Sequence, residues 1–191
     1  MSVVIESLLS RNSTKQITGP GPSEEQLEQI FATAMRAPDH ALLRPWRFKR
    51  IEGANIDRLV SLAVKAMADE NQPLDGAKEK NLRKWLGQVP LVIAVASYID
   101  HSNDRIPEHE RMLATGAAVM NILNATHALG FGAFWSTGIG TYTDAVPAAL
   151  GFDTLEHEFL GFIVVGSLSG VVEPKTRPDF ADYVQTWEPM A

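Results

Sequence analysis

The strongest constraint on folding in this sequence is a long helical pattern whose middle carries almost no polar side chain. The pattern runs from about residue 107 to residue 129, and Gly130 ends it. Residues 114–120 read ATGAAVM, so every face of the helix is small or apolar there. A helix of this kind is buried on several sides, and its small side chains allow another helix to approach closely. The sequence therefore predicts a core helix that is shared with a partner chain.

Strand and helix patterns are interleaved along the chain, but not in regular alternation. Apolar runs predict strands at residues 46–51, 91–96, 131–136 and 159–168. Further helices are predicted at residues 2–10, 23–37 and 55–66, with short ones near 78–85 and 143–151. Two helices precede the first strand, unlike the order of a doubly wound dinucleotide fold. This order indicates an α+β fold in which a sheet lies between layers of helices.

Four of these helices have a candidate N-cap, and Ser2 is the candidate for the first of them. Ser23 is followed by Gln26 at the spacing of a capping box. Asn55 and Thr143 are expected to cap the helices that follow them.

The length of 191 residues fits one domain that covers the whole chain, 1–191. Residues 68–87 are charged and contain Pro73 and Gly76, which favours a lid-like excursion. Residues 172–191 contain three prolines and are expected to form an extended C-terminal arm that lies on another surface.

Composition excludes several classes of function. The net charge is −6 and the pI is about 5.3, so general nucleic-acid binding is not expected. With no cysteine, disulfides, thiol catalysis and thiolate metal sites are absent, as suits a reducing compartment. The first residues lack the pattern of a signal peptide, and the apolar runs are too short to span a membrane. We expect a cytoplasmic protein without membrane contact.

Two short polar segments are candidates for binding an anionic, planar ligand. Arg11, Asn12 and Ser13 follow the first helix, and Arg36 and His40 flank a bend at Pro38. Arg and Ser can hydrogen-bond a phosphate. Each segment also has an ordinary interpretation, as a helix end with its turn or as surface residues. Lys175 and Arg177 gain interest if the phosphate needs a further cation.

The segment from Gly130 to Gly140 is a strand pattern bracketed by glycines. Thr143 stands where a dinucleotide-binding loop would have its third glycine, and no complete βαβ unit follows, so a Rossmann site is not favoured. Contact of Trp135, Ser136 and Thr137 with a flat ring fits better. The acids and histidines of residues 101–110 are interpreted as a solvated helix start, so no metal site is expected.

Taken together, these segments resemble the FMN-dependent nitroreductase family, and most closely its short, YdjA-like branch. The resemblance rests on Arg11-Asn12-Ser13, on residues 35–40 (MRAPDH) with Pro45-Trp46 behind them, and on residues 130–135 (GFGAFW). It spans residues 3 to about 168, with the motifs in the family's order. It implies a three-layer α-β-α sandwich with a mostly antiparallel sheet.

The resemblance also implies a homodimer with FMN at the interface. Arg11, Asn12 and Ser13 would hold FMN from one subunit, and the partner would contribute its Arg36 and His40. Trp135, Ser136 and Thr137 would line the flavin, and the arm would wrap the partner and bring Arg177 near the phosphate. Family members often have arginine where this chain has Asn12 and Ser136, so we expect Lys175 or Arg177 to replace a missing cation.

The implied activity is reduction of nitroaromatics, quinones or other electron-poor acceptors by NAD(P)H, with ping-pong hydride transfer through flavin N5. The flavin carries the chemistry, so no catalytic side chain is expected, and Arg11 is the first candidate for a cation at the pyrimidine edge. Two alternatives stay open: a flavin-binding or flavin-storage dimer without enzymatic activity, and an interaction module with no cofactor.

Overall fold

A computed structural model describes residues 1–189 of the chain. Its sheet is built around a long pair of antiparallel strands, β3 (Leu91–Tyr98) and β5 (His157–Leu168). β2 (Trp46–Glu52) pairs with the other edge of β3, while β4 (Phe131–Ser136) and the two-residue β1 (Ile17–Thr18) pair with β5. All four pairings are antiparallel, as the family resemblance implied.

The apolar run of β3 is buried on both faces of the sheet. Val92, Ala94 and Ala96 belong to one hydrophobic cluster, and their neighbours Ile93 and Val95 belong to another. Alternate residues of a strand point to opposite faces, so the two clusters lie on the two sides of the sheet. The prediction of a strand covered on both faces is confirmed.

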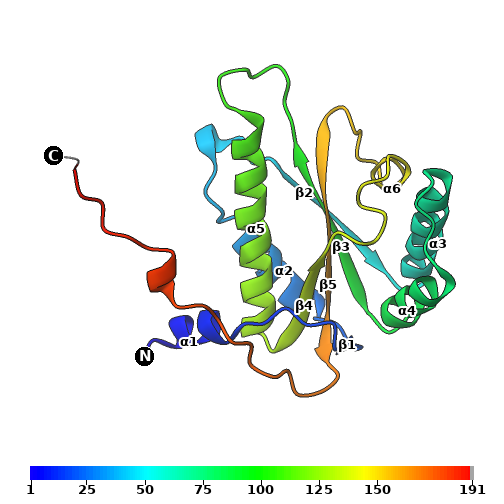
Figure 1. Ribbon diagram of the computed structural model, residues 1–191, viewed down its shortest axis with the longest axis horizontal. Coiled ribbons are helices and arrows are strands. Elements are labelled where there is room, and N and C mark those ends of the chain that lie inside the picture. The colour runs from blue at the N-terminus through cyan, green and yellow to red at the C-terminus, as the bar shows by residue number, and fades with distance from the viewer. Residues whose placement is uncertain (190–191) are drawn as a thin grey trace.

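Helices cover the two faces and complete a three-layer sandwich (Figure 1). One face carries α2 (Glu24–Ala34) and the long α5 (Glu108–Ala128), whose buried residues include Ile30 and Ile122. The other face carries α3 (Ala54–Asp69), α4 (Gly76–Leu86) and α6 (Ala145–Ala149). The short α1 (Val3–Ser10) contributes no buried residue and lies beside the C-terminal end of α5.

The helix starts agree only partly with the expected caps. The capping box is confirmed: Ser23 Oγ accepts from the Gln26 backbone N–H at 3.2 Å, and Gln26 Oε1 accepts from that of Ser23 at 2.9 Å. Ser2 stands at the N-cap position of α1, but its side chain makes no capping hydrogen bond. The caps predicted at Asn55 and Thr143 are wrong. Gly53, with φ 54°, precedes α3, which leaves Asn55 inside the helix. Thr143 donates to the Gly140 carbonyl oxygen and closes a turn before Asp144, the actual cap of α6.

Two segments differ from the predicted elements. β1 lies outside the strands that the sequence predicts, but Ile17 is 2% exposed and pairs with Leu168 of β5. A two-residue strand is too short to produce a visible pattern. The lid expected over 68–87 stays a prediction. In the structure, 68–69 complete α3 and 76–86 form α4, whose Leu86 is fully buried. Only residues 70–75 lie between these helices.

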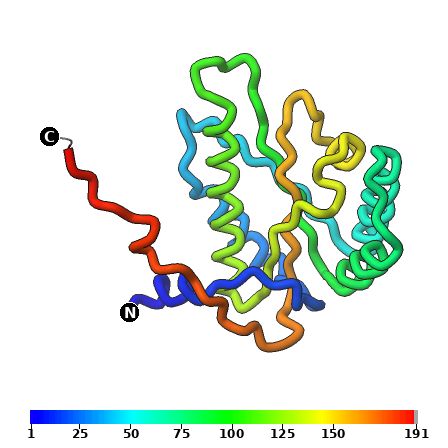
Figure 2. Tube along the Cα trace, viewed as in Figure 1, coloured from blue at the N-terminus to red at the C-terminus, as the bar shows by residue number. Residues whose placement is uncertain are grey.

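The C-terminal arm leaves the body of the molecule. From residue 172 the chain passes α1 and runs outward, with one 3₁₀ turn, Phe180–Asp182 (Figure 2). Its large side chains Phe180, Tyr183 and Trp187 are each at least 75% exposed. Apart from the 3₁₀ turn, residues 172–189 form no helix or strand. The extended arm expected over 172–191 stays a prediction, and residues 190–191 lie outside the described part. No helix among residues 1–189 has the length and hydropathy needed to cross a lipid bilayer.

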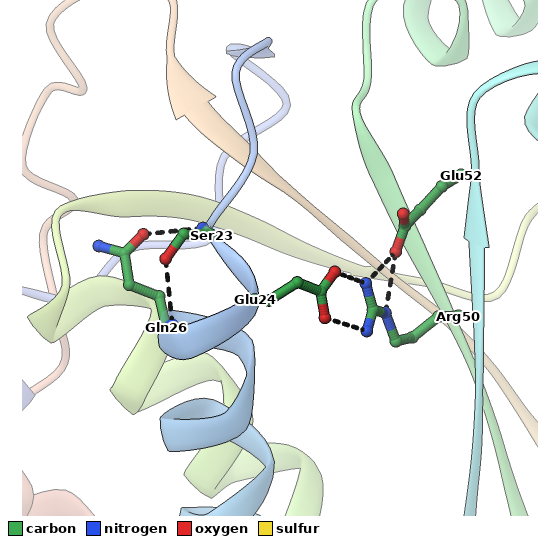
Figure 3. Close-up of polar contacts among 5 residues, drawn as sticks. All are labelled: Ser23, Glu24, Gln26, Arg50 and Glu52. Atoms are coloured by element: carbon green, nitrogen blue, oxygen red, sulfur yellow. Dashed lines mark hydrogen bonds and ion pairs between the residues drawn. The ribbon is translucent and has the colours of Figure 1, made fainter.

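An arginine on β2 connects the sheet to the start of α2 (Figure 3). Both terminal nitrogens of Arg50 donate to the Glu24 carboxylate, at 2.6 and 2.8 Å, and its Nε donates to Glu52 at 2.8 Å. These hydrogen bonds lower the pKa of Glu24 below its ordinary value of 4.5. A forked arrangement fixes orientation better than a single ion pair.

We predict that Glu24→Gln lowers the thermal midpoint at neutral pH. Because the pKa of Glu24 is depressed in the folded state, its pairing stabilises the fold above pH 4.5 and is lost as pH falls through the folded-state pKa. The difference from wild type should therefore shrink toward pH 3. Glu25→Gln is the matched control, because Glu25 also lies in the first turn of α2 but has no ion pair among residues 1–189. Equal shifts in both variants would contradict this account.

Candidate functional site

The candidate site is organised by an extended segment, residues 11–15, that leaves α1 and runs beside β4. Ser13 forms an isolated parallel bridge with Ala133, and the Thr14 N–H donates to the Ala133 carbonyl oxygen at 3.0 Å. Side chains alternate along extended backbone. Accordingly, Arg11 Nη1 reaches Ser13 Oγ at 3.5 Å. Asn12 and Thr14 line a hollow to which neither Arg11 nor Ser13 contributes. The segment therefore presents Arg11, Ser13 and Lys15 on one side.

The beginning of the C-terminal arm adds two cations to this segment. Lys175 Nζ donates to the Ser13 carbonyl oxygen at 3.2 Å. Arg177 Nη2 donates to Asn12 Oδ1 at 3.0 Å and reaches the Arg11 carbonyl oxygen at 3.5 Å. Lys175 and Arg177 thus both bond to the short segment 11–13 that also carries Arg11. Among residues 1–189, none of the ion pairs involves Arg11, Lys175 or Arg177.

A histidine near the end of α5 borders the same cluster. His127 Nε2 lies 3.0 Å from Ser10 Oγ, next to Arg11. Burial lowers the pKa of His127, and the charge of Arg11 lowers it further. Burial and the single charge of Arg11 thus both disfavour a positive charge on His127.

A hollow of about 360 Å³ opens at the other end of the extended segment. Its lining includes Lys15 from the segment, Ser136, Gly138 and Ile139 from the end of β4, and Lys78, Asn81 and Trp85 from α4. Trp85 Nε1 donates to the Lys15 carbonyl oxygen at 3.2 Å, which attaches α4 to the segment. Lys15 Nζ lies 4.8 Å from the Trp85 ring and 4.9 Å from the Phe134 ring, so cation–π contacts hold it in place.

The end of β4 is fixed by close packing against β5. Gly161 has φ +94°, and a Cβ there would lie 2.5 Å from the Ser136 carbonyl oxygen, so only glycine fits. The Ser136 hydroxyl accepts from the Gly138 N–H at 3.3 Å. Ser136 lines the hollow and Thr137 is exposed beside it. Trp135 points to the opposite face of the sheet, where its Nε1 donates to the Leu160 carbonyl oxygen at 2.8 Å.

Arg36 and His40 lie elsewhere on the chain. His40 Nδ1 is 2.7 Å from Glu110 Oε2, near the start of α5, whereas Ser10 contacts His127 near its end. With a rise of 1.5 Å per residue, these two contacts are about 25 Å apart along the helix. Arg36 is exposed just beyond α2. The structure therefore does not bring Arg36 or His40 to Arg11 within one chain.

The turn that follows His40 has unusual backbone geometry. Ala41, Leu42 and Arg44 all have positive φ, between 47° and 57°, which non-glycine residues rarely adopt. The Asp39 carboxylate accepts from the Arg44 N–H at 2.6 Å and helps to hold the turn. Such conformations often occur where a turn presents side chains to a ligand.

Of the nine expected site residues, the structure groups Arg11, Asn12, Ser13 and Arg177 in one cluster and places Ser136 and Thr137 near the hollow. Lys15 was missed, although it follows Ser13 by two residues and the alternation of an extended segment would have put it on the same side. Lys78, Asn81 and Trp85 were also missed. They fell in the expected lid, and no local pattern indicates that α4 packs beside β4.

Comparison with known proteins gives the fold a family. A family model described as the nitroreductase family matches residues 8–167. The chain belongs to the nitroreductase family. This match confirms the nitroreductase resemblance that the sequence motifs indicated. YdjA of Escherichia coli K12, which carries the name of an NAD(P)H nitroreductase, is 31% identical over 166 residues, 85% of this chain and 87% of YdjA.

Solved structures of family members have the same fold. A nitroreductase-like family protein from Bacillus cereus superposes with a TM-score of 0.85 at 21% identity, covering 99% of this chain and 98% of the other. A nitroreductase relative from Desulfovibrio desulfuricans, solved in complex with FMN, superposes with a TM-score of 0.76 at 22% identity, covering 99% of both chains. At these identities the likeness establishes the fold.

We predict that Arg11→Gln raises the pKa of His127. Removing a nearby positive charge makes the imidazolium form less unfavourable, although burial still holds the pKa below 6.5. An NMR titration of the imidazole carbon-bound protons measures the change. Arg58→Gln, on the far face of the sheet, is the control and should leave the titration unaltered. An unchanged midpoint in Arg11→Gln would mean that Arg11 is not electrostatically coupled to His127.

Proposed function

We propose that this nitroreductase-family chain is the subunit of an FMN-dependent NAD(P)H oxidoreductase that reduces nitroaromatics, quinones or similar electron-poor acceptors. One observation carries the proposal: a single extended segment has a cluster of cations at one end and a ring-sized hollow with a fixed lysine at the other. A phosphorylated planar cofactor needs both environments along one short path. The cytoplasmic location expected from the sequence stays a prediction.

The donor set at the cluster fits a phosphate group. Arg11, Lys175 and Arg177 would supply charge-assisted hydrogen bonds, and Ser13 would add a hydroxyl. The part of the chain described here places none of these three cations in an ion pair, so their charge is available to an anion. The overall negative charge of the chain makes such a local cluster necessary.

The hollow fits the flavin ring. Lys15 lies within cation–π range of two neighbouring aromatic rings, which favours a position of its ammonium group at the lining. Ser136 and Thr137 would meet the ring from the end of β4, while Asn81 from α4 offers an amide. When bound, FMN supplies the two-electron hydride chemistry.

Within this arrangement the chain's own residues position and tune the cofactor. Lys15 places a positive charge at the ring end, where it would stabilise negative charge that develops on reduction. The sequence suggested Arg11 for this role. We assign Arg11 instead to the phosphate end, because it lies beside Ser13, Lys175 and Arg177. No side chain is needed as a general acid. NAD(P)H and the acceptor would use the open side in turn, as a ping-pong reaction requires.

The proposed active form is a homodimer. The outer side of α5 exposes Leu113 and Met120, and α1 exposes Val3, Val4 and Leu9, all of them large apolar residues. A two-fold axis across the middle of α5 would bury these groups. It would also move the partner's His40, which lies near the start of α5, toward the Arg11 end of this chain. The distance between Arg36 or His40 and Arg11 within one chain thus supports a site shared by two subunits. The arm would then have the partner's surface to lie on.

We predict that the purified protein is yellow and that NADH or NADPH bleaches it anaerobically, with colour restored by a quinone or nitroaromatic acceptor. Visible absorbance at the flavin maximum follows both half-reactions. Retained FMN that neither donor bleaches would instead support the flavin-binding or storage dimer. A colourless protein that takes up no added FMN would reject the cofactor and leave the interaction module as the function.

A second prediction concerns the helix that the two copies would share. A Cβ at Gly116 meets nothing within 4 Å in the single chain, so a larger side chain costs the monomer fold little. Gly116→Leu should nevertheless weaken the dimer, because it separates helices that approach through small residues. Light scattering after gel filtration measures the mass, and circular dichroism verifies the fold. Gly76→Leu, also without neighbours but on α4, is the control. A Gly116→Leu dimer as stable as wild type would exclude α5 as the interface.

A further inference from the structure

Asn12 links α1 to the C-terminal arm through both ends of its side-chain amide. Its Nδ2 donates to the Ser10 carbonyl oxygen at 3.1 Å, and its Oδ1 accepts from Arg177 Nη2 at 3.0 Å. A carbonyl can only accept and a guanidinium can only donate, so these two partners determine which end of the amide is oxygen. Asn12 is half-buried, whereas Arg177 is exposed.

The bond to Asn12 is the only hydrogen bond from Arg177 to another side chain in the part of the chain described here. The remaining contact, with the Arg11 carbonyl oxygen, is long at 3.5 Å. An exposed arginine on an extended arm has many rotamers, and fixing one of them costs conformational entropy. A partner that is itself held by the backbone lowers that cost before any ligand arrives.

Asn12 already has both ends of its amide hydrogen-bonded within the chain, to Ser10 and to Arg177. Together with Thr14 and His127 it lines a separate hollow of about 230 Å³. If the Asn12 amide turned toward a ligand, it would lose its hydrogen bonds to Ser10 and Arg177. The sequence suggested Asn12 as a direct contact of the cofactor, and this geometry favours a different role.

We propose that Asn12 is a positioning residue that aims Arg177 at the phosphate of the cofactor. The inference rests on the proposed FMN function and deepens it. Asn12 acts through Arg177 and does not touch the phosphate. Asn12 is itself neutral, but in this role it brings a cation from the arm to the neighbourhood of Arg11.

The test is a double-mutant cycle on cofactor affinity, measured by quenching of flavin fluorescence. Arg177→Ala should weaken FMN binding about tenfold or more, as expected for one charge-assisted hydrogen bond. Asn12→Ala should weaken it by several fold in the wild-type background and have no further effect in Arg177→Ala. Lys175→Ala is the matched control: Lys175 bonds Ser13 and not Asn12, so its effect and that of Asn12→Ala should multiply.

Riboflavin, which lacks the phosphate, separates positioning from general damage. Its affinity should be the same in Asn12→Ala as in wild type, and thermal unfolding should show that both are folded. Asn12→Asp provides a second variant: it still accepts from Arg177 but adds a negative charge, so it should weaken FMN and spare riboflavin.

Three results would overturn the inference alone while FMN binds the wild type: no effect of Asn12→Ala, an equal effect with and without Arg177, or an equal loss of riboflavin. A wild-type protein that binds no FMN would overturn the proposed function and this inference with it.

Discussion

The burial of β3 and β5 on both faces is the constraint on which the rest of the structure depends. Their alternating side chains enter two separate hydrophobic clusters, and each cluster needs its own layer of helices. Val92, Ile93, Val164 and Phe162 are fully buried, so neither layer can be removed without exposing the centre of the sheet. The three-layer order follows from this, and with it the place of β4 beside β5.

The candidate site forms where the segment of residues 11–15 runs along the free edge of that sheet. β4 offers its outer edge to residues 13–14, which bond to Ala133 and hold the extended segment in place. The arm supplies Lys175 and Arg177, and α4 supplies Trp85. Three parts of the chain far apart in sequence thus contribute to one path from a cationic cluster to a hollow.

The single chain also leaves apolar groups without cover on the side of α5. They lie on α1, on α5 and on the arm, and α5 also carries the small residues that allow another helix to approach. The distance between His40 and Arg11 within one chain is a second feature that a partner chain would explain. A second copy related by two-fold symmetry would address both features at once, and this makes the oligomeric state the property most closely tied to the proposed chemistry.

The sequence by itself determined the fold class, the family, the two-faced β3, the bounds of α5 and β4, and the types of residue at the cationic cluster. These are local properties: periodicity, an apolar run, a glycine stop and a short motif persist whatever the rest of the chain does. Tertiary structure alone decided that α4 packs beside β4, that Lys15 contacts the rings of Trp85 and Phe134, and that Asn12 bonds Arg177. It also decided that Ile17 forms a strand, since two residues carry no pattern until Leu168 pairs with them. Contacts between segments distant in sequence depend on how the layers pack, and no spacing within either segment encodes them.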